Sequence, residues 1–124
     1  MADTYIPGTC NLGKSEVRRR QTVALLGLAL ALFSGFGLWE GSLIARLTIF
    51  LPLFVFATGF IQSRRKFCMA YGFSGAFNLG RLGELSRVQD PADRAADRKT
   101  ALSILGQAAL LALALTLLYL AISA

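Results

Sequence analysis

The sequence contains no histidine and only two cysteines among 124 residues, and these absences exclude several kinds of chemistry. Without histidine, the chain cannot ligate haem through an imidazole or form a serine–histidine–aspartate triad. A metal site normally needs three or four protein ligands, so two thiols cannot complete one unless subunits share it. We therefore expect a protein that is not an enzyme and that holds no cofactor or metal.

Charged residues are almost absent from three long apolar stretches. These are residues 21–38, 43–61 and 101–123, and Arg46 carries the one charge within them. A helix needs about 20 mostly apolar residues to cross a bilayer, and 55% of this chain is hydrophobic. The pattern predicts an all-α membrane protein, with residues 1–124 forming a single membrane domain that contains three transmembrane helices.

Basic residues gather at one predicted end of these helices. Of the 13 Lys and Arg residues, all except Arg46 lie before residue 21 or within the loop 62–100. Because cytoplasmic loops are enriched in Lys and Arg, we expect the N-terminus and this loop to be cytoplasmic and the C-terminus to be outside. Such an arrangement is typical of a small protein of a bacterial-type inner (plasma) membrane, with its first apolar stretch retained as a signal anchor.

The net charge of +6 has a simple explanation in this arrangement. Basic residues beside membrane helices are attracted to the anionic lipid headgroups of the cytoplasmic leaflet. No sequence pattern of an RNA- or DNA-binding module is evident. We therefore expect membrane lipids as partners, and no nucleic acid.

Local signals indicate where the helices begin and bend. Ser15 is placed to cap the first helix, and Asp90 followed by Pro91 marks the start of the third, which we expect to run to about Ile122. Within the second apolar stretch, Pro52 removes one backbone donor and predicts a kink.

The cytoplasmic loop has an apolar residue at every third position over residues 79–88. This spacing, with charged residues in between, predicts a short amphipathic helix lying in the membrane interface. The residues are Leu79, Leu82, Leu85 and Val88.

Small residues recur at every fourth position in the first and third apolar stretches. Such stripes allow two helix backbones to approach closely. Either they pack the three helices together, or at least one of them faces another subunit. The residues are Gly27, Ala31 and Gly35 in the first stretch, and Ala108, Ala112 and Thr116 in the third.

The segment 8–15 matches the phosphate-binding loop pattern G-x-x-x-x-G-K-[ST] letter for letter. A true loop of this kind follows a strand of a parallel sheet, which this sequence does not predict, so we do not expect nucleotide hydrolysis. The weaker interpretation is a site for a phosphate or lipid headgroup at the start of the first helix. Its residues would be Gly8, Gly13, Lys14 and Ser15.

Cys10 and Cys68 are both expected in the cytoplasm, where thiols stay reduced. Two unreactive thiols are the simplest interpretation, and a redox pair is the alternative. Each cysteine lies near an Asn-Leu-Gly-basic tetrapeptide, at 11–14 and 78–81. We expect residues 9–15 to fold against residues 67–81 as one cytoplasmic cap, which would bring the two cysteines near each other.

These features favour a non-catalytic accessory or assembly subunit of a larger inner-membrane complex, in contact with other membrane subunits or with further copies of itself. The main alternative is a small homo-oligomeric transporter or channel, whose path would need Arg46, Thr48, Thr58 and Gln107. A membrane redox or nucleotide/phosphate-binding protein, using the two cysteines and the 8–15 loop, is the third hypothesis.

The charge distribution predicts on which side of the membrane each end of the chain lies. A reporter enzyme fused after Ala124 should be active outside the cytoplasm, whereas one inserted at Asp90 should be active inside it. Paired alkaline phosphatase and fluorescent-protein fusions in bacterial cells measure this. Cytoplasmic activity after Ala124 would contradict the arrangement with three spans.

Overall fold

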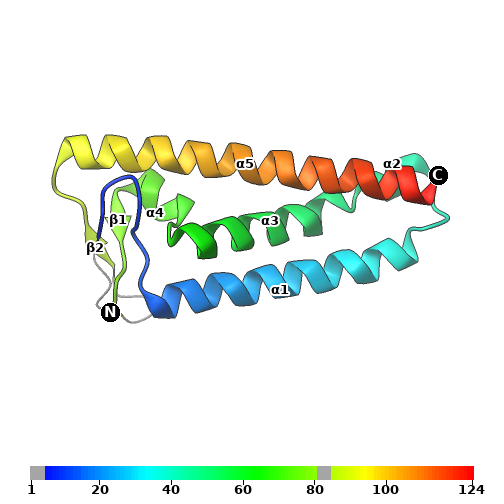
Figure 1. Cartoon of the computed structure of the whole chain (residues 1–124), viewed down its shortest axis with the longest axis horizontal. Helices are drawn as coiled ribbons and strands as arrows, with labels where there is room; N and C mark the ends of the chain where they lie inside the picture. Colours follow the sequence, from blue (N-terminus) through cyan, green and yellow to red (C-terminus); the bar gives the residue numbers. More distant parts are fainter. Residues whose placement is uncertain (1–4, 81–84) are drawn as a thin grey trace.

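The computed structural model describes residues 5–80 and 85–124 and is mostly helical (Figure 1). Three helical segments are long and apolar enough to cross a membrane, as predicted. In chain order the elements are α1 (Lys14–Gly37), α2 (Leu43–Leu47), α3 (Phe50–Arg65), α4 (Met69–Ser74), β1 (Ala76–Phe77), β2 (Ser86–Arg87) and α5 (Pro91–Ser123).

The sequence predicted the cap of α5 correctly but not the cap of α1. Asp90 caps α5 as expected, and its side chain accepts a hydrogen bond from the amide of Ala92 at 2.9 Å. The cap of α1 is Gly13 and not Ser15, and Gly13 has no side chain with which to cap this end. The amide of Gly13 donates to the carbonyl of Asn78 at 2.8 Å, so a contact with a distant segment fixes where α1 begins.

The second candidate membrane span is divided near Pro52, but the break lies one turn before the proline. Helix α2 ends at Leu47, and α3 begins at Phe50. A proline ring clashes with the carbonyl four residues earlier, here that of Thr48. This carbonyl instead accepts a hydrogen bond from the amide of Leu51 at 3.2 Å. The segment therefore consists of two helices joined by a tight turn.

The amphipathic helix expected over residues 79–88 is not seen in the described part of that segment. Residues 81–84 lie outside the described residues, while Ser86–Arg87 pairs antiparallel with Ala76–Phe77. Gly75 has a φ of 74°, which ends α4 and turns the chain toward this pairing. The amide of Val88 then donates to the carbonyl of Gly75 at 2.8 Å. Backbone pairing at Gly75 thus replaces the expected helix, and the short helix of this loop is α4.

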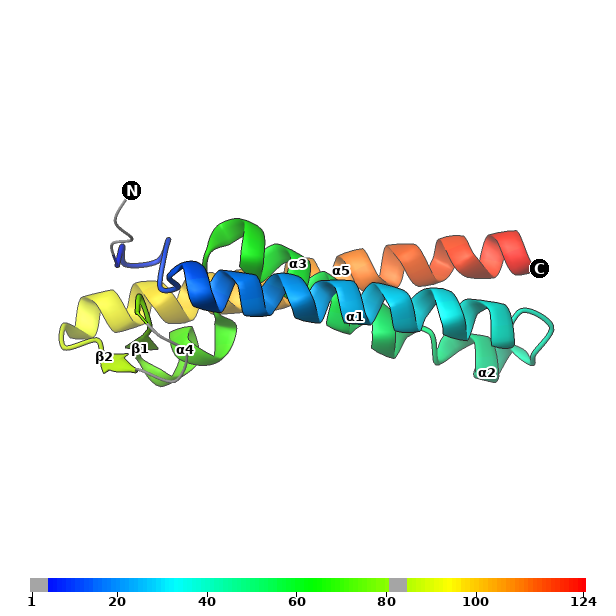
Figure 2. The same cartoon turned by 90° about the horizontal axis from the view of Figure 1, so that it is seen from below.

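Helix α3 lies between α1 and α5 (Figure 1), and the three helices run along a common axis (Figure 2). An ideal Cβ at Gly27 would lie 2.6 Å from the amide nitrogen of Phe56, and one at Gly59 would lie 2.7 Å from that of Ala24. Helices α1 and α3 therefore pack backbone to backbone. The apolar core of the bundle consists of Ala31, Ile49, Leu53, Ala57, Ala108 and Ala112.

Both small-residue stripes face the interior of this single chain. All three stripe residues of α1 and all three of α5 are buried, namely Gly27, Ala31, Gly35, Ala108, Ala112 and Thr116. The ring of Tyr119 covers Gly35, where an added Cβ would lie 3.4 Å from the ring. The hydroxyl of Thr116 donates to the carbonyl of Ala112 at 2.7 Å. The stripes thus serve the packing of the three helices.

The polar residues considered for a transport path make mostly local hydrogen bonds. The amide of Gln107 donates to Ser103, one turn earlier in α5, at 3.2 Å. The hydroxyls of Thr48 and Thr58 donate to backbone carbonyls three residues earlier. Arg46 donates to the hydroxyl of Ser123 at 2.9 Å, at the far end of α5.

The contact at Gly27 predicts different outcomes for two glycine substitutions. Gly27→Ala should destabilise the protein, because its new methyl group meets the backbone of Phe56, and overpacking of this kind costs about 1–3 kcal/mol. Gly106→Ala is the matched control, since a Cβ added there meets nothing within 4 Å. Unfolding in mixed micelles with a denaturing detergent measures both. Equal stability of the two variants would show that α1 and α3 are not in backbone contact.

Candidate functional site

At one end of the helices, the N-terminal segment and the loop before α5 form a polar unit, here called the cap (Figure 1). It comprises residues 5–13, 66–80 and 85–90 together with the first turns of α5, residues 91–100. The predicted packing of residues 9–15 against residues 67–81 is confirmed for the described residues by the backbone hydrogen bonds that join them.

The carboxylate of Asp97 holds the N-terminal segment on α5 and is fully buried. The hydroxyl of Tyr5 donates to Oδ2 and the amide of Gly8 donates to Oδ1, both at 2.7 Å. The hydroxyl of Thr100 donates to the carbonyl of Gly8 at 2.6 Å. Burial, and after it the hydrogen bond to Asp97, raises the pKa of Tyr5.

Asn11 joins the N-terminal segment to the chain that follows α3. Its fully buried side chain accepts a hydrogen bond from the amide of Cys68 at 2.7 Å and donates to the carbonyl of Cys68 at 3.3 Å. The amides of Asn11 and Leu12 donate to the carbonyl of Lys66 at 3.0 and 3.2 Å. Because an asparagine side chain carries the same donor and acceptor as a peptide group, Asn11 acts here like a paired strand residue.

The two Asn-Leu-Gly sequences lie side by side. Leu12 and Asn78 form an isolated parallel bridge, and the amide of Asn78 donates to the carbonyl of Asn11 at 2.9 Å. An ideal Cβ on Gly13 would lie 2.5 Å from the carbonyl oxygen of Leu79, so this contact requires glycine. The two Asn-Leu-Gly sequences, which are distant in the chain, therefore pair with each other in the fold.

The loop that matches the phosphate-binding pattern uses its amides within the protein. Every amide from Gly8 to Gly13 donates to another group of the chain, and the acceptors are Asp97, Ile6, Lys66 and Asn78. Lys14 and Ser15 are exposed in the first turn of α1. Binding of a phosphate at this end would therefore depend on side chains and on the first turn of α1, and not on a ring of glycine amides.

A buried ion pair lies where α1 meets α4. Glu16 is fully buried, and its carboxylate lies 3.4 Å from Nη2 of Arg20 and 3.7 Å from Nη1 of Arg19. The same Nη2 of Arg20 donates to Sγ of Cys68 at 3.0 Å, and the guanidinium lies 5.9 Å from the centre of the Tyr71 ring. Burial, and after it the charge of Glu16, raises the pKa of Tyr71. Both ion pairs of Glu16 lie within α1 and hold Arg20 in place, and Arg20 connects α1 to α4 through its contact with the ring of Tyr71.

Both cysteines lie in the cap as free thiols. Cys68 is buried and accepts the hydrogen bond from Arg20, whereas Sγ of Cys10 lies 3.6 Å from the carbonyl oxygen of Leu12. Asn11 brings their two segments together, but each sulfur contacts a different group. Over residues 5–80 and 85–124, no three side chains of the His, Cys, Asp or Glu type are grouped to hold a metal ion.

Sequence reasoning missed the two buried carboxylates of this site. Glu16 and Arg20 are spaced by four residues, which is a recognisable signal for an ion pair on a helix. Asp97 offers no comparable signal, because its partners Tyr5 and Gly8 lie 92 and 89 residues away in the sequence.

Comparison with protein-family models, with curated proteins and with solved structures finds no match to this chain. Its class is therefore defined by its own residues: a mostly helical protein with three candidate membrane spans and a hydrogen-bonded cap at one end.

The contacts of Asp97 predict that Asp97→Asn releases the N-terminal segment. An amide has one acceptor oxygen and no charge, so Tyr5 and Gly8 can no longer both donate to a carboxylate. A hydrogen bond to a charged group contributes about 1.5–3 kcal/mol, so local opening should increase at least about tenfold. Limited proteolysis before Ser15 in mild detergent measures this opening. Asp93→Asn in the same helix is the control, and an equally resistant Asp97→Asn variant would contradict the assigned role.

Proposed function

We propose that this chain is a non-catalytic accessory or assembly subunit of a larger membrane complex. The observation that carries the proposal is an apolar groove of about 470 Å³ in the part of the bundle distant from the cap. Its walls come from all three long helices. They include Leu28, Leu32 and Phe36 of α1, Leu53 and Phe56 of α3, and Leu118 of α5.

Two aromatic residues mark the end of this groove. The hydroxyl of Tyr119 donates to the carbonyl of Gly35 at 2.8 Å, and the ring of Trp39 meets that of Tyr119 edge to face, with 5.9 Å between their centres. Trp and Tyr are enriched where a membrane helix reaches the bilayer surface. The groove thus runs inward from one membrane surface, between α1 and α5 and over α3.

The occupant that this groove fits is a transmembrane helix of a partner protein. Within lipid, helices associate through close packing and not through the hydrophobic effect, so a concave surface offers more contact than a convex one. The lining includes the small residues Ala31 and Gly35 and the large side chains of Phe36, Trp39 and Tyr119. Small and large residues in one concave surface favour close packing of a helix in the groove.

The cap provides a second surface for a partner. The exposed ring of Phe73 and the guanidinium groups of Arg94 and Arg98 surround a hollow of about 230 Å³ beside α4. Positive charge of this kind favours an acidic partner segment. We place the cap on the cytoplasmic side of a bacterial-type inner membrane, and the support for this is the concentration of Lys and Arg at the cap end.

A pair of photo-crosslinking positions tests the groove. A photoreactive amino acid at Leu118, which lines the groove, should form an adduct with one defined membrane protein in native membranes. The same amino acid at Leu110 is the control, because Leu110 is exposed on the same helix without lining the groove, and it should react with lipid. Mass spectrometry identifies each adduct.

A groove-filling variant makes this test specific. Leu32→Trp places a larger side chain in the groove and should remove the adduct at Leu118 and reduce the size of the native complex. An adduct between two copies of this chain would favour the homo-oligomeric transporter instead. Lipid adducts alone at both positions would overturn the proposal.

A further inference from the structure

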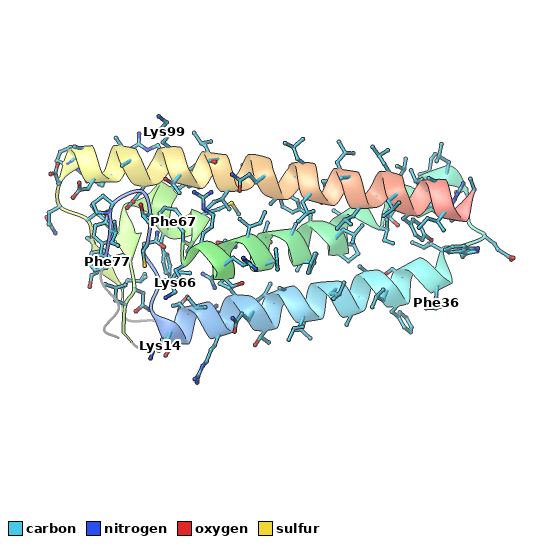
Figure 3. The ribbon with its side chains drawn as sticks, viewed as in Figure 1. Lys14, Phe36, Lys66, Phe67, Phe77 and Lys99 are labelled. Carbon is cyan, nitrogen blue, oxygen red and sulfur yellow. The ribbon has the colours of Figure 1, made fainter. Side chains whose placement is uncertain are left out.

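A second hollow continues the groove at the end of the bundle opposite the cap. It has a volume of about 460 Å³ and is lined by Phe36, Gly37, Trp39 and Glu40. Phe36 and Trp39 also line the groove, so the two hollows meet along these rings. Figure 3 labels Phe36 at this end of α1. A helix that lies in the groove therefore extends over the second hollow where it leaves the groove.

Glu40 gives this second hollow a negative charge. It is the only acidic residue in residues 21–83, so every other carboxylate of the chain belongs to the region of the cap or to the first turn of α1. Among the described residues, no Lys or Arg nitrogen lies within 4.0 Å of the Glu40 carboxylate. The basic residue nearest to it in the sequence, Arg46, donates to Ser123 instead. The charge of Glu40 is therefore available to a partner.

The end of α1 adds to the negative potential of this hollow. The carbonyl groups at the C-terminus of a helix carry a partial negative charge, equivalent to about half an elementary charge. Helix α1 ends at Gly37, which lines the hollow, and its last turn contains no basic residue. A cation placed in the hollow therefore meets both the carboxylate of Glu40 and the negative end of α1.

The two aromatic rings of the hollow also favour a cation. A Lys or Arg side chain is attracted to the face of an aromatic ring within about 6 Å, and tryptophan attracts it most strongly. The half-exposed ring of Trp39 is held edge to face against Tyr119, and Phe36 is exposed. Long basic side chains bury their apolar stems along such surfaces and keep the charged group in water. The lining thus suits both the stem and the charge of a Lys or Arg side chain.

We propose that the partner helix in the groove carries a Lys or Arg at this end, and that this residue pairs with Glu40 against the rings of Phe36 and Trp39. The inference rests on the proposed function, because it names the chemistry of the same partner. Basic residues of membrane proteins are concentrated on the cytoplasmic side. With the cap in the cytoplasm, a basic residue at the opposite end distinguishes the partner from most other membrane helices.

The photo-crosslink at Leu118 provides the measurement, with Glu40 varied in the full-length protein in native membranes. Glu40→Lys places a like charge opposite the basic residue of the partner, so the yield of the protein adduct should fall at least about tenfold. Glu40→Asp keeps the charge and is the matched control, with a yield within about twofold of that of the unmodified protein. Because Glu40 is exposed, both variants should fold, and resistance of the N-terminal segment to proteolysis verifies this.

A charge exchange tests the pairing directly. The adduct at Leu118 identifies the partner, and the Lys or Arg that flanks the partner's span at this end is replaced by Glu. This partner variant alone should reduce the adduct, whereas its combination with Glu40→Lys should restore most of it. A partner that carries no Lys or Arg beside that end of its span would overturn the inference.

The proposed function and this inference fail through different results. An adduct at Leu118 that forms equally well with Glu40→Lys would overturn the pairing with Glu40 and leave the groove as a site for a helix. The absence of any protein adduct with the unmodified Glu40 would overturn the groove as a helix site, and the pairing with it.

Discussion

The structure of the cap depends on the buried side chain of Asn11. This side chain pairs with both backbone groups of Cys68, and the neighbouring amides of Asn11 and Leu12 pair with Lys66. Without Asn11, the amide of Cys68 would be buried without this partner, and a buried unpaired polar group costs about 1–3 kcal/mol. The carbonyl of Cys68 would keep the hydrogen bond that it accepts from the amide of Gly72 at 2.9 Å. Backbone hydrogen bonds of the same segment hold the turn at Lys66 and, through Gly13 and Asn78, the start of α1 and the alignment of the two Asn-Leu-Gly sequences.

The membrane part of the fold could be predicted from the sequence because its signals are local. The lack of charge in three stretches, the Asp90 cap and the stripes of small residues are all properties of neighbouring residues. The position of the break before Pro52 follows from one clash within a single turn. These features can be predicted without knowing which distant residues they contact.

The cap could be predicted only in outline, because its bonds join residues that are distant in sequence. The shared Asn-Leu-Gly letters correctly indicated which two segments meet. They did not indicate that Gly13 would cap α1, or that Asp97 would accept bonds from Tyr5 and Gly8. The prediction of a helix over residues 79–88 was wrong for the described residues of that segment. The apolar spacing gave no indication of the turn at Gly75 or of the strand pairing that this turn permits.

The membrane helices and the cap also differ in the range of the contacts that hold them. Helices α1 and α3 belong to consecutive candidate membrane spans, and their backbones meet at Gly27 and Gly59. Helix α5 packs in the same core through Ala108 and Ala112. At the cap, by contrast, Tyr5 and Gly8 from the N-terminal segment bind Asp97 of α5.

The distance of 92 residues between Tyr5 and Asp97 therefore has a consequence for biosynthesis. While only the first two candidate spans have been synthesised, Asp97 is absent, and Tyr5 and Gly8 lack the acceptor that they use in the folded chain. The cap closes only after the start of α5 has been synthesised. Closure of the cap thus marks the arrival of the start of α5, and a protease that reads exposed N-terminal segments would distinguish chains that contain this helix from chains that still lack it.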